Sequence, residues 1–592
     1  MKLSDYVVDF LAKQGIKHNF LVTGGAVLHL ADSTSKHPSM KHICVQHEEF
    51  GAAAADGYSR AGGNLGLAMT TSGPGATNLL TSICNAHFDS IPMICITGQV
   101  ARFRLRPNKK LRQRGFQETD ISSVFESVTK YVKLVTDPSM IRYELEKAIF
   151  IAKEGRPGPV VLDIPDDLQR EEVEPNRLHP YTPEPTLPKI NGLLVEKLFT
   201  MISDAKRPVL IVGAGVHCAK VEKEIIKFAE YFNLPILLTW GATDLIPYEH
   251  PLNMGGVGVC GPRAGNFAAQ SSDLVIAIGT RLSQMITGGK QNLFAPLAKK
   301  VMIDIDPEEL NKFKEDTFLL DLPILANLKD FFLHCDLLYK ASCVDHFLSW
   351  REKIQDWKKR YPICSQQDYE KKGRLNPYVF VKELSKISRE NDIIVTDTGA
   401  NICWMMQAFE TKPGQKIFSA WNHTPMGYSL PASIGAALST GKEITCLIGD
   451  GGLMMCLQEL ATVKRYNLPI KIFIFENKGH ATVKQTIEIW LKANYVAVDE
   501  DSGLSFPDYQ KLAETFHLPF YSLQNHDQLQ KELPLLFKKK GPFICHLAVD
   551  ETHRIVPMLK FGKGLEDLDP KLPGEELESV MNEYKNLTPS LL

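Results

Sequence analysis

Short apolar runs alternate with helical segments along most of this chain, and this alternation constrains the fold more than any other feature. Runs such as PMICITG at 92–98, PVLIVGAG at 208–215 and EITCLIGDGG at 443–452 are apolar on both faces of a strand. Strands buried on both faces and joined by helices are typical of parallel sheets in α/β domains. A chain of 592 residues is also too long for one hydrophobic core. We therefore expect three α/β domains with parallel sheets and a C-terminal tail.

Breaks in the alternation give the expected domain boundaries. The segment 171–190 carries five prolines and cannot form one regular element, so we predict a linker there. A polar, Trp- and Lys-rich connection separates the second and third stretches. The predicted organisation is a first domain at 1–170, a linker at 171–190, a central domain at 191–345, a linker at 346–375, a third domain at 376–552 and a tail at 553–592.

Charge and cysteine usage exclude several function classes. A formal net charge of -2 gives no overall attraction to nucleic acid or to an anionic membrane. The 12 cysteines show no C-x-x-C pair, which favours a reducing compartment over a disulfide framework or a zinc site. The start of the chain lacks the apolar core of a signal peptide, and no apolar run reaches the ~18 residues of a membrane span. We expect a cytoplasmic protein that binds neither nucleic acid nor membrane.

The most specific signal lies between two consecutive apolar strands. Asp450 follows the first strand in a Gly-Asp-Gly turn, and Asn477 ends the second strand 27 positions later. One β-α-β crossover fills that interval, so both side chains are expected at adjacent carboxyl ends of one sheet, where open α/β sheets bind ligands. One carboxylate, one amide oxygen and a backbone carbonyl at Gly479 are hard oxygen ligands that suit Mg²⁺.

Glycines surround the predicted metal ligand. Gly449, Gly451 and Gly452 allow the backbone to approach a diphosphate closely, and the helix that follows directs its N-terminal N–H groups at the anion. Asp-Gly alone is ordinary turn chemistry. Followed by an asparagine at the end of the next strand, it matches the motif of thiamin-diphosphate (ThDP) enzymes, and the chain resembles that family.

Further segments resemble the acetolactate synthases within this family. The resemblance covers about residues 3 to 552. Its clearest segments are HEEFGAAAADGYSR at 47–60, TTSGPGATNLLT at 70–81, FDSIPMICITGQV at 88–100, GFQETDI at 115–121 and RPGPVVLDIP at 156–165. It implies a pyrimidine-binding first domain, a central domain and a diphosphate-binding third domain.

The resemblance assigns roles to individual residues. Glu48 aligns with the glutamate that hydrogen-bonds N1′ of the aminopyrimidine and so promotes loss of the thiazolium C2 proton. The alternative is that Glu48 only favours the helix dipole at a first turn, as its neighbour Glu49 does. Gln117 is implied to be catalytic, and Met426 to be the apolar wedge that keeps ThDP bent, rather than a plain core residue. The other implied ThDP contacts are Gly24, Gly25, Pro74, Gly75, Asn78, Gly427, His480 and Ala481.

The reaction implied by the resemblance starts from a 2-keto acid such as pyruvate. ThDP and Mg²⁺ support its decarboxylation, and the two-carbon fragment passes to a carbonyl acceptor. A homodimer or homotetramer is implied as well, because the glutamate-bearing domain of one subunit faces the diphosphate-bearing domain of another. The alternatives are a decarboxylase or oxidase with the same cofactor and a non-catalytic regulatory homologue; the intact Glu48, Asp450 and Asn477 argue against the last.

The segment after the metal loop departs from the acetolactate synthases. Their pattern G-M-V-x-Q-W is replaced by ATVKQT at 481–486, so Thr482 and Thr486 stand where a methionine and a tryptophan shape the acceptor pocket. We expect a larger or more polar acceptor than a second pyruvate. His480 is either a surface residue or a donor to an acceptor oxygen. NKGHATVKQT and SGLSFPDYQKLAE more closely resemble the carboligases encoded with polysaccharide-biosynthesis genes, some of which contain flavin and use keto-sugar nucleotides.

A basic run has three interpretations. Seven of the 13 residues in Arg102–Arg114 are Lys or Arg. The run is a solvated loop, a polyanion site or, given the resemblance to enzymes of keto-sugar nucleotides, a contact for substrate phosphates.

The central domain resembles the flavin-binding domain of acetolactate synthases. GTR at 279–281 and IDIDPEEL at 303–310 carry this resemblance, whereas the Gly-Ala-Gly at 213–215 is too short for a dinucleotide fingerprint. Ser283 and Met285 depart from the pattern, so FAD binding stays open, with a structural role where it occurs. The implied flavin contacts are Arg156, Gly213, Arg281, Asp304 and Asp306.

Overall fold

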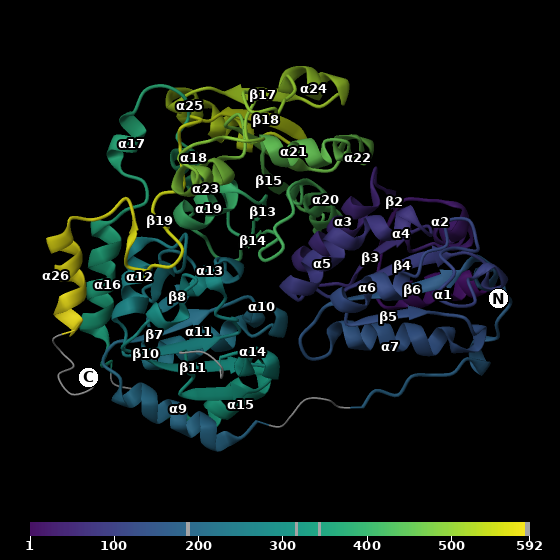
Figure 1. The fold of residues 1–592 in the computed structure, drawn as a ribbon, viewed down its shortest axis with the longest axis horizontal. Helices are drawn as coiled ribbons and strands as arrows, with labels where there is room; N and C mark the ends of the chain where they lie inside the picture. Colours follow the sequence, from purple (N-terminus) through teal and green to yellow (C-terminus); the bar gives the residue numbers. More distant parts are fainter. Residues whose placement is uncertain (185–189, 314–317, 341–344, 586–592) are drawn as a thin grey trace.

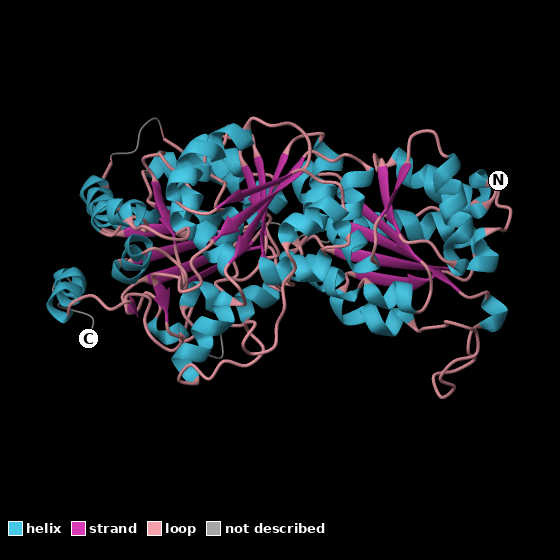
Figure 2. Cartoon of the chain, turned by 90° about the horizontal axis from the view of Figure 1, so that it is seen from above, coloured by secondary structure: helices cyan, strands magenta, loops and turns pink. Residues whose placement is uncertain are grey.

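The computed structural model describes residues 1–184, 190–313, 318–340 and 345–585. In these residues three parallel six-stranded sheets follow one another along the chain, with strands inside 18–165, 208–325 and 393–548. Helices flank each sheet (Figures 1 and 2). The predicted fold of three parallel α/β domains is confirmed.

The N-terminal sheet has the strand order β2-β1-β3-β4-β6-β5. All seven residues of β4 and of β6 are buried, as expected for central strands covered on both faces. Its strands are β1 (His18–Leu21), β2 (Lys41–Cys44), β3 (Gly66–Thr70), β4 (Met93–Gln99), β5 (Tyr131–Leu134) and β6 (Pro159–Pro165). The helices are α1 (Leu3–Lys13), α2 (Leu28–Lys36), α3 (Glu48–Gly62), α4 (Pro74–Asn78), α5 (Leu80–Asp89), α6 (Ile121–Phe125), α7 (Ile141–Lys153) and α8 (Asp166–Gln169).

The central sheet has a different order, β12-β11-β10-β7-β8-β9, so the direction of strand addition reverses between β7 and β10. Its strands are β7 (Pro208–Val212), β8 (Ile236–Leu238), β9 (Asn253–Gly256), β10 (Leu274–Ile278), β11 (Lys299–Asp304) and β12 (Leu322–Leu325). The helices are α9 (Gly192–Asp204), α10 (Gly215–Ala219), α11 (Glu222–Phe232), α12 (Arg263–Ser271), α13 (Gln284–Thr287), α14 (Pro307–Asn311) and α15 (Leu328–Leu338).

The C-terminal sheet, β14-β13-β15-β16-β18-β17, repeats the order of the N-terminal sheet. Its strands are β13 (Ile393–Thr396), β14 (Lys416–Phe418), β15 (Ile444–Gly449), β16 (Ile470–Glu476), β17 (Phe520–Leu523) and β18 (Phe543–Ala548). The helices are α18 (Pro377–Ile387), α19 (Ala400–Ala408), α20 (Ser429–Thr440), α21 (Asp450–Cys456), α22 (Glu459–Arg465), α23 (Ala481–Trp490), α24 (Tyr509–Thr515) and α25 (His526–Phe537). Within the described ranges, no helix combines the length and the apolar character that crossing a bilayer requires.

The segment 346–375, predicted as a linker, contains two helices, α16 (Leu348–Arg360) and α17 (Gln366–Glu370). Trp350, Ile354 and Trp357 share one face of α16 and are buried in the core with residues of α12. Their spacing of four and three residues is helical, which explains why a segment rich in lysine folds onto the central domain. Of the other predicted linker, at 171–190, residues 185–189 lie outside the described residues.

The tail crosses back from the C-terminal domain to the central domain (Figure 1). It forms the strands β19 (Met558–Leu559) and β20 (Leu568–Asp569) and the helix α26 (Gly574–Lys585). Asn266 Nδ2 in α12 donates to the Leu565 carbonyl at 3.1 Å, and Arg360 in α16 pairs with Glu576 at 2.7 Å. The tail therefore ties two domains together; residues 586–592 of the predicted tail lie outside the described residues.

Helices α3 and α20 join the N-terminal and C-terminal domains. A Cβ atom on Gly57 would lie 2.2 Å from the Ala432 carbonyl oxygen, and one on Gly435 would lie 1.8 Å from the Ala54 carbonyl oxygen. Real Cβ atoms do not approach an oxygen so closely, so this crossing requires glycine at both positions. The two helix backbones are consequently in direct contact.

A buried ionic network supports the same junction. Arg60 Nε donates to Asp56 Oδ1 at 2.6 Å, and Arg60 Nη2 donates to Asp89 Oδ2 at 2.7 Å. The hydroxyl of Tyr428 in the C-terminal domain donates to Asp56 Oδ1. All these side chains are almost fully buried, so each charge depends on its partners, and the domain that supplies Tyr428 is fixed against the other.

Candidate active site

The predicted metal ligands meet at the carboxyl ends of β15 and β16, which are neighbouring parallel strands. Asp450 is 2% exposed, and its Oδ2 accepts hydrogen bonds from the backbone N–H groups of Asn477 and Gly479, both at 3.1 Å. The amide oxygen of Asn477 lies 3.0 Å from the Gly479 carbonyl oxygen and 3.2 Å from Asp450 Oδ2. Three oxygen atoms therefore face one another, an arrangement that either a rotated amide or a bound cation satisfies.

The electrostatics of this cluster favour a cation. Burial raises the pKa of Asp450 to about 7, although the N–H groups of Gly451, Gly479 and Asn477 counteract it. A deprotonated Asp450 at this buried position therefore costs free energy unless a positive charge lies beside it. One carboxylate and two neutral oxygens are the hard ligands that suit Mg²⁺, which keeps further positions for phosphate oxygens. The residues present fit the predicted ion.

The two glycines after Asp450 are packed too closely against other residues for a side chain to fit. A Cβ atom on Gly451 would lie 2.5 Å from His480 Cε1 and 3.0 Å from Met426 Cε. A Cβ atom on Gly452 would lie 2.0 Å from Asp397 Oδ2. Met426 and His480 therefore meet over bare backbone at the start of α21. The geometry fits a backbone that an anionic diphosphate approaches closely at a helix N-terminus.

Asp397 is a residue that sequence reasoning missed. It follows β13 and accepts hydrogen bonds from the backbone N–H groups of Gly427 at 3.0 Å and Tyr428 at 3.2 Å, which fixes the turn that carries Met426. Burial raises the pKa of Asp397 to about 7, with these N–H groups counteracting it. The strand order reverses between β13 and β15, so Asp397 and Asp450 flank the crevice where open sheets bind ligands. The available signal was an aspartate directly after the apolar strand at 393–396.

A second cluster forms around Glu48, the first residue of α3. Glu48 Oε2 accepts a hydrogen bond from Asn78 Nδ2 at 2.9 Å. A Cβ atom on Gly75 would lie 3.4 Å from Glu48 Oε1, and one on Gly73 would lie 3.0 Å from Gln117 Cβ. The short helix α4, which Pro74 opens, thus brings the predicted catalytic and cofactor-binding residues of this domain to one place.

The remaining predicted contacts lie in turns at strand ends. Gly24 follows β1, and a Cβ atom on it would lie 2.5 Å from Thr71 Cβ in the turn after β3. Gly25 has open space beside it. Gly427 adopts a positive φ of 85° next to Met426, and Ala481 opens α23 as a buried residue. The structure therefore places the candidate contacts in two groups, one around Glu48 and one around Asp450.

Comparison with known proteins gives the family. Three family models match in sequence: "Thiamine pyrophosphate enzyme, N-terminal TPP binding domain" at 1–124, "Thiamine pyrophosphate enzyme, central domain" at 195–333 and "Thiamine pyrophosphate enzyme, C-terminal TPP binding domain" at 397–547. The probable acetolactate synthase large subunit of Methanocaldococcus jannaschii is 32% identical over 98% of both chains. Chloroplastic acetolactate synthase 1 of Nicotiana tabacum is 32% identical over 96% of this chain and 84% of that protein. The chain belongs to the acetolactate synthase-like thiamin-diphosphate enzymes.

In this thiamin-diphosphate enzyme the C-terminal domain also holds the segment that leads to Glu48. Glu459 in α22 is fully buried; its Oε1 accepts from the Gln46 N–H at 2.8 Å and its Oε2 from the Thr462 hydroxyl at 2.7 Å. Burial raises the pKa of Glu459 to about 7, with these hydrogen bonds counteracting it. Glu459 lies 413 positions from Gln46, and no local pattern marks it.

Helix α23 carries the two threonines that depart from the family pattern. The Thr482 hydroxyl is buried without a hydrogen-bond partner among the described residues, and the exposed Thr486 hydroxyl donates to the Thr482 carbonyl at 3.0 Å. Gln485 exchanges two hydrogen bonds of 2.9 Å with the backbone of Ile555 in the tail. The tail therefore fixes the position of α23. The Thr482 hydroxyl of this helix remains available as a hydrogen-bond donor.

A cavity of about 390 Å³ lies where the central sheet reverses its strand order. Residues of all three domains line it, among them Trp240 and Trp421. Residues that directly follow β7 and β10, among them Gly213 and Gly279, line it, which is the usual position of nucleotides in such sheets. Four of the five predicted flavin contacts line this cavity, namely Arg156, Gly213, Arg281 and Asp304.

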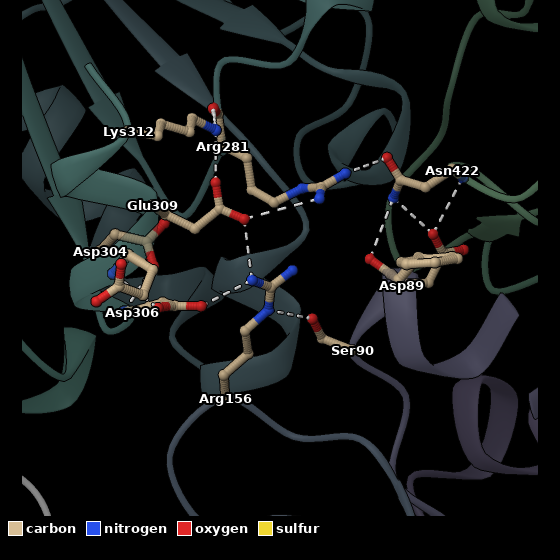
Figure 3. A network of polar contacts seen from close by, with 11 residues as sticks. Asp89, Ser90, Arg156, Arg281, Asp304, Asp306, Glu309, Lys312 and Asn422 are labelled. Carbon is tan, nitrogen blue, oxygen red and sulfur yellow. Dashed lines mark hydrogen bonds and ion pairs between the residues drawn. The ribbon is translucent and has the colours of Figure 1, made fainter. Parts of the chain in front are cut away.

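Charged side chains of the cavity lining take part in a network of polar contacts between domains (Figure 3). Arg156 Nη1 donates to Asp306 Oδ2 at 2.9 Å and to Glu309 Oε1 at 3.0 Å, so its charge is already balanced by carboxylates. Arg281 donates to Asn422 of the C-terminal domain. Burial raises the pKa of Asp304 to about 6, and the N–H of Asp306 counteracts it.

Proposed function

We propose that this enzyme decarboxylates pyruvate or a related 2-keto acid and joins the two-carbon unit to a carbonyl acceptor, with ThDP and Mg²⁺ as cofactors. The observation that carries the proposal is that Asp450, Asn477 and Gly479 meet at the carboxyl ends of the neighbouring strands β15 and β16, next to Gly451 and Gly452. These residues would hold Mg²⁺, and the backbone at the start of α21 would lie beside the diphosphate. Bound ThDP would supply the carbon nucleophile that the protein lacks. Relatives named acetolactate synthase support the reaction class.

The residues around Glu48 supply proton transfer in this proposal. Asn78 holds the Glu48 carboxylate by one hydrogen bond and leaves its second oxygen free to exchange a proton with N1′ of the cofactor. Met426 projects beside Gly451 as an apolar support for the cofactor ring. Gln117 lies at the edge of the same group, where a substrate oxygen would need a donor.

We also propose that the active site is shared between two copies of this chain. Both halves of the site expose large apolar side chains: Leu28 is 55% and Phe116 85% exposed on the N-terminal domain, and Met455 is 51% and Trp490 64% exposed on the C-terminal domain. A second copy that covers these residues removes apolar surface from water.

Mixing two inactive variants tests the shared site. When Glu48→Gln and Asp450→Ala homodimers exchange subunits, half of the sites in each heterodimer are free of both substitutions, so activity returns. If each site lies within one chain, no mixture regains activity, and the shared site is wrong.

The acceptor we propose is larger or more polar than pyruvate, with keto-sugar nucleotides as one class. Thr482 and Thr486 support this, because both replace bulky residues of the family and one offers an unpaired hydroxyl. The enzyme is incubated with pyruvate and a panel of carbonyl acceptors, and products are identified by mass spectrometry. Pyruvate consumption must depend on added ThDP and Mg²⁺. Oxygen uptake identifies an oxidase, free aldehyde a decarboxylase, and no consumption a non-catalytic homologue.

For the central cavity we propose FAD in a structural role. Its position at the strand reversal and its tryptophan lining support a flavin nucleotide. Two features count against tight FAD binding. Arg156 is already paired with two carboxylates, and Ser283 and Met285 differ from the residues of the family pattern. Visible flavin absorbance in the purified protein, and flavin release on denaturation, test this assignment. A protein that is colourless and that binds no added FAD contradicts it. We retain the cytoplasm as the proposed location.

A further inference from the structure

The basic run of the first domain is not uniformly neutralised in the structure. Arg102 pairs with Asp167 at 2.8 Å, Arg106 with Asp120 at 2.9 Å, and Lys109 lies 3.7 Å from the same Asp120. The run contains no acidic residue between positions 102 and 114. Four of its cations are exposed and have no carboxylate partner among the described residues: Arg104, Lys110, Arg112 and Arg114.

A single buried carboxylate holds this loop in shape. Glu118 is 6% exposed and accepts hydrogen bonds from the backbone N–H groups of Arg106 at 2.6 Å, Arg114 at 2.7 Å and Gly115 at 3.1 Å. Burial raises the pKa of Glu118, but these N–H groups and the Arg106 charge outweigh it and leave the pKa below its usual value. The two ends of the loop are therefore tied together, and the four exposed cations without carboxylate partners belong to this closed loop.

The closed frame stands beside the candidate active site. Gly115 is buried, and the residue two positions later, Gln117, adopts a positive φ of 61° against Gly73. Helix α4 starts at that contact and brings Asn78 into its hydrogen bond with Glu48. The loop is thus joined through Gln117 to the group that we propose as the proton-transfer site. A solvated loop needs neither a buried carboxylate frame nor this position.

We propose that the loop 104–114 binds the phosphate groups of the acceptor, so that the acceptor is a phosphorylated carbonyl compound such as a nucleoside diphosphate sugar. This inference rests on the proposed carboligase function, and it names the acceptor class. Guanidinium groups bind phosphate oxygens in pairs, and four cations without carboxylate partners match a diphosphate better than the single carboxylate of a keto acid. Pyruvate alone gives no use for so many positive charges.

The test compares two variants that each lose four charges. In the first, Arg104, Lys110, Arg112 and Arg114 are all replaced by Gln. The control variant removes four exposed lysines elsewhere, at Lys17, Lys133, Lys223 and Lys299. Binding of UDP to the ThDP- and Mg²⁺-loaded enzyme is measured by calorimetry, so that the cofactor already fills its own diphosphate site. We expect the loop variant to weaken UDP binding by about 10–100-fold, from four modest ion contacts, and the control to bind as the unmodified enzyme does.

A third variant tests the contribution of the loop conformation to UDP binding separately from the contribution of the four positive charges. Glu118→Gln keeps all four cations but weakens the ties at both ends of the loop, so UDP binding is expected to fall less than in the four-residue variant and to remain below the control. The affinity of the unmodified enzyme for UDP is also expected to fall as salt rises.

Three results would overturn the inference. UDP affinity equal in the loop variant and the control excludes phosphate binding by the loop. Loss of heparin binding with unchanged UDP binding assigns the loop to a polyanion instead. Loss of the dimer in the loop variant, seen by light scattering, with unchanged UDP binding per chain, assigns it to subunit contact. Pyruvate consumption is measured separately, so an enzyme that binds UDP through the loop but consumes no pyruvate contradicts the proposed carboligase alone.

Discussion

The N-terminal and C-terminal sheets share one strand order but carry their candidate site residues after different strands. In both, the order counted along each domain is second, first, third, fourth, sixth and fifth. Glu48 follows the second strand of its domain, at the edge of the sheet, whereas Asp450 and Asn477 follow the third and fourth strands of theirs. The same scaffold therefore offers several carboxyl ends, and the residues placed after each strand decide which end is used.

The two groups of candidate residues, one around Glu48 and one around Asp450, also differ in the hydrogen bonds that their acidic side chains accept. Backbone N–H groups from three residues surround Asp450. One side-chain amide, that of Asn78, holds Glu48. A backbone frame exists before any ligand binds, so the group around Asp450 would be preformed for the cofactor binding that we propose. For the proton exchange proposed for Glu48, fewer fixed hydrogen bonds would leave one carboxylate oxygen available.

Asp450→Ala is expected to give the largest effect, because it removes the only carboxylate of the oxygen cluster. Mg²⁺-dependent binding of ThDP is lost, and all turnover with it. Calorimetric titration of ThDP with and without Mg²⁺ measures this. Unchanged affinity would mean that the metal binds elsewhere and that the proposed contrast between the two halves is mistaken.

Glu48→Gln is expected to separate catalysis from binding. Gln cannot carry the proton to N1′, so turnover falls ~10²–10⁴-fold while ThDP binding stays largely intact. The neighbouring Glu49→Gln serves as the control and keeps turnover close to that of the unmodified enzyme. Turnover that is unaffected in Glu48→Gln removes this residue from the mechanism.

Thr486→Trp tests the acceptor side of the C-terminal half. Restoring a large apolar side chain is expected to favour pyruvate as second substrate by ~1–3 kcal/mol, or roughly 10–100-fold, relative to a larger carbonyl acceptor. Thr486→Val removes the hydroxyl without adding bulk and is the control. Efficient acetolactate synthesis by the unmodified enzyme at low pyruvate, or equal loss of both reactions in the tryptophan variant, contradicts the prediction.

Glu459→Gln tests how the buried carboxylate that links the C-terminal domain to the Gln46 N–H makes the stability of the protein depend on pH. The pKa of Glu459 is raised to about 7 in the folded state, so its stabilising contribution is complete below its ordinary pKa and is lost as pH rises through about 7. The variant is expected to remove this loss and to become more stable than the unmodified protein by about 1–3 kcal/mol above pH 7. Urea unfolding at several pH values measures it. A constant difference between the two proteins at every pH contradicts it.

Local pattern was enough to predict part of this architecture. The proximity of Asp450 and Asn477 could be predicted because each follows an apolar strand and one crossover separates the two strands. Asp397 and Glu459 were missed because their partners are backbone groups in distant segments, and no spacing in sequence reports such a contact. The helix α16 was missed for another reason: its lysines obscured three apolar residues at helical spacing.

The direct backbone contact between α3 and α20 has a consequence for protein engineering. At Gly57 and Gly435 the two helices leave no space for any side chain. Each helix therefore fits only a partner helix that carries glycine at the point of contact. A chimera that exchanges only the N-terminal domain with a relative would place new residues against an unchanged α20. The smallest interchangeable module is therefore the first domain together with α20, although that helix belongs to the third domain in sequence.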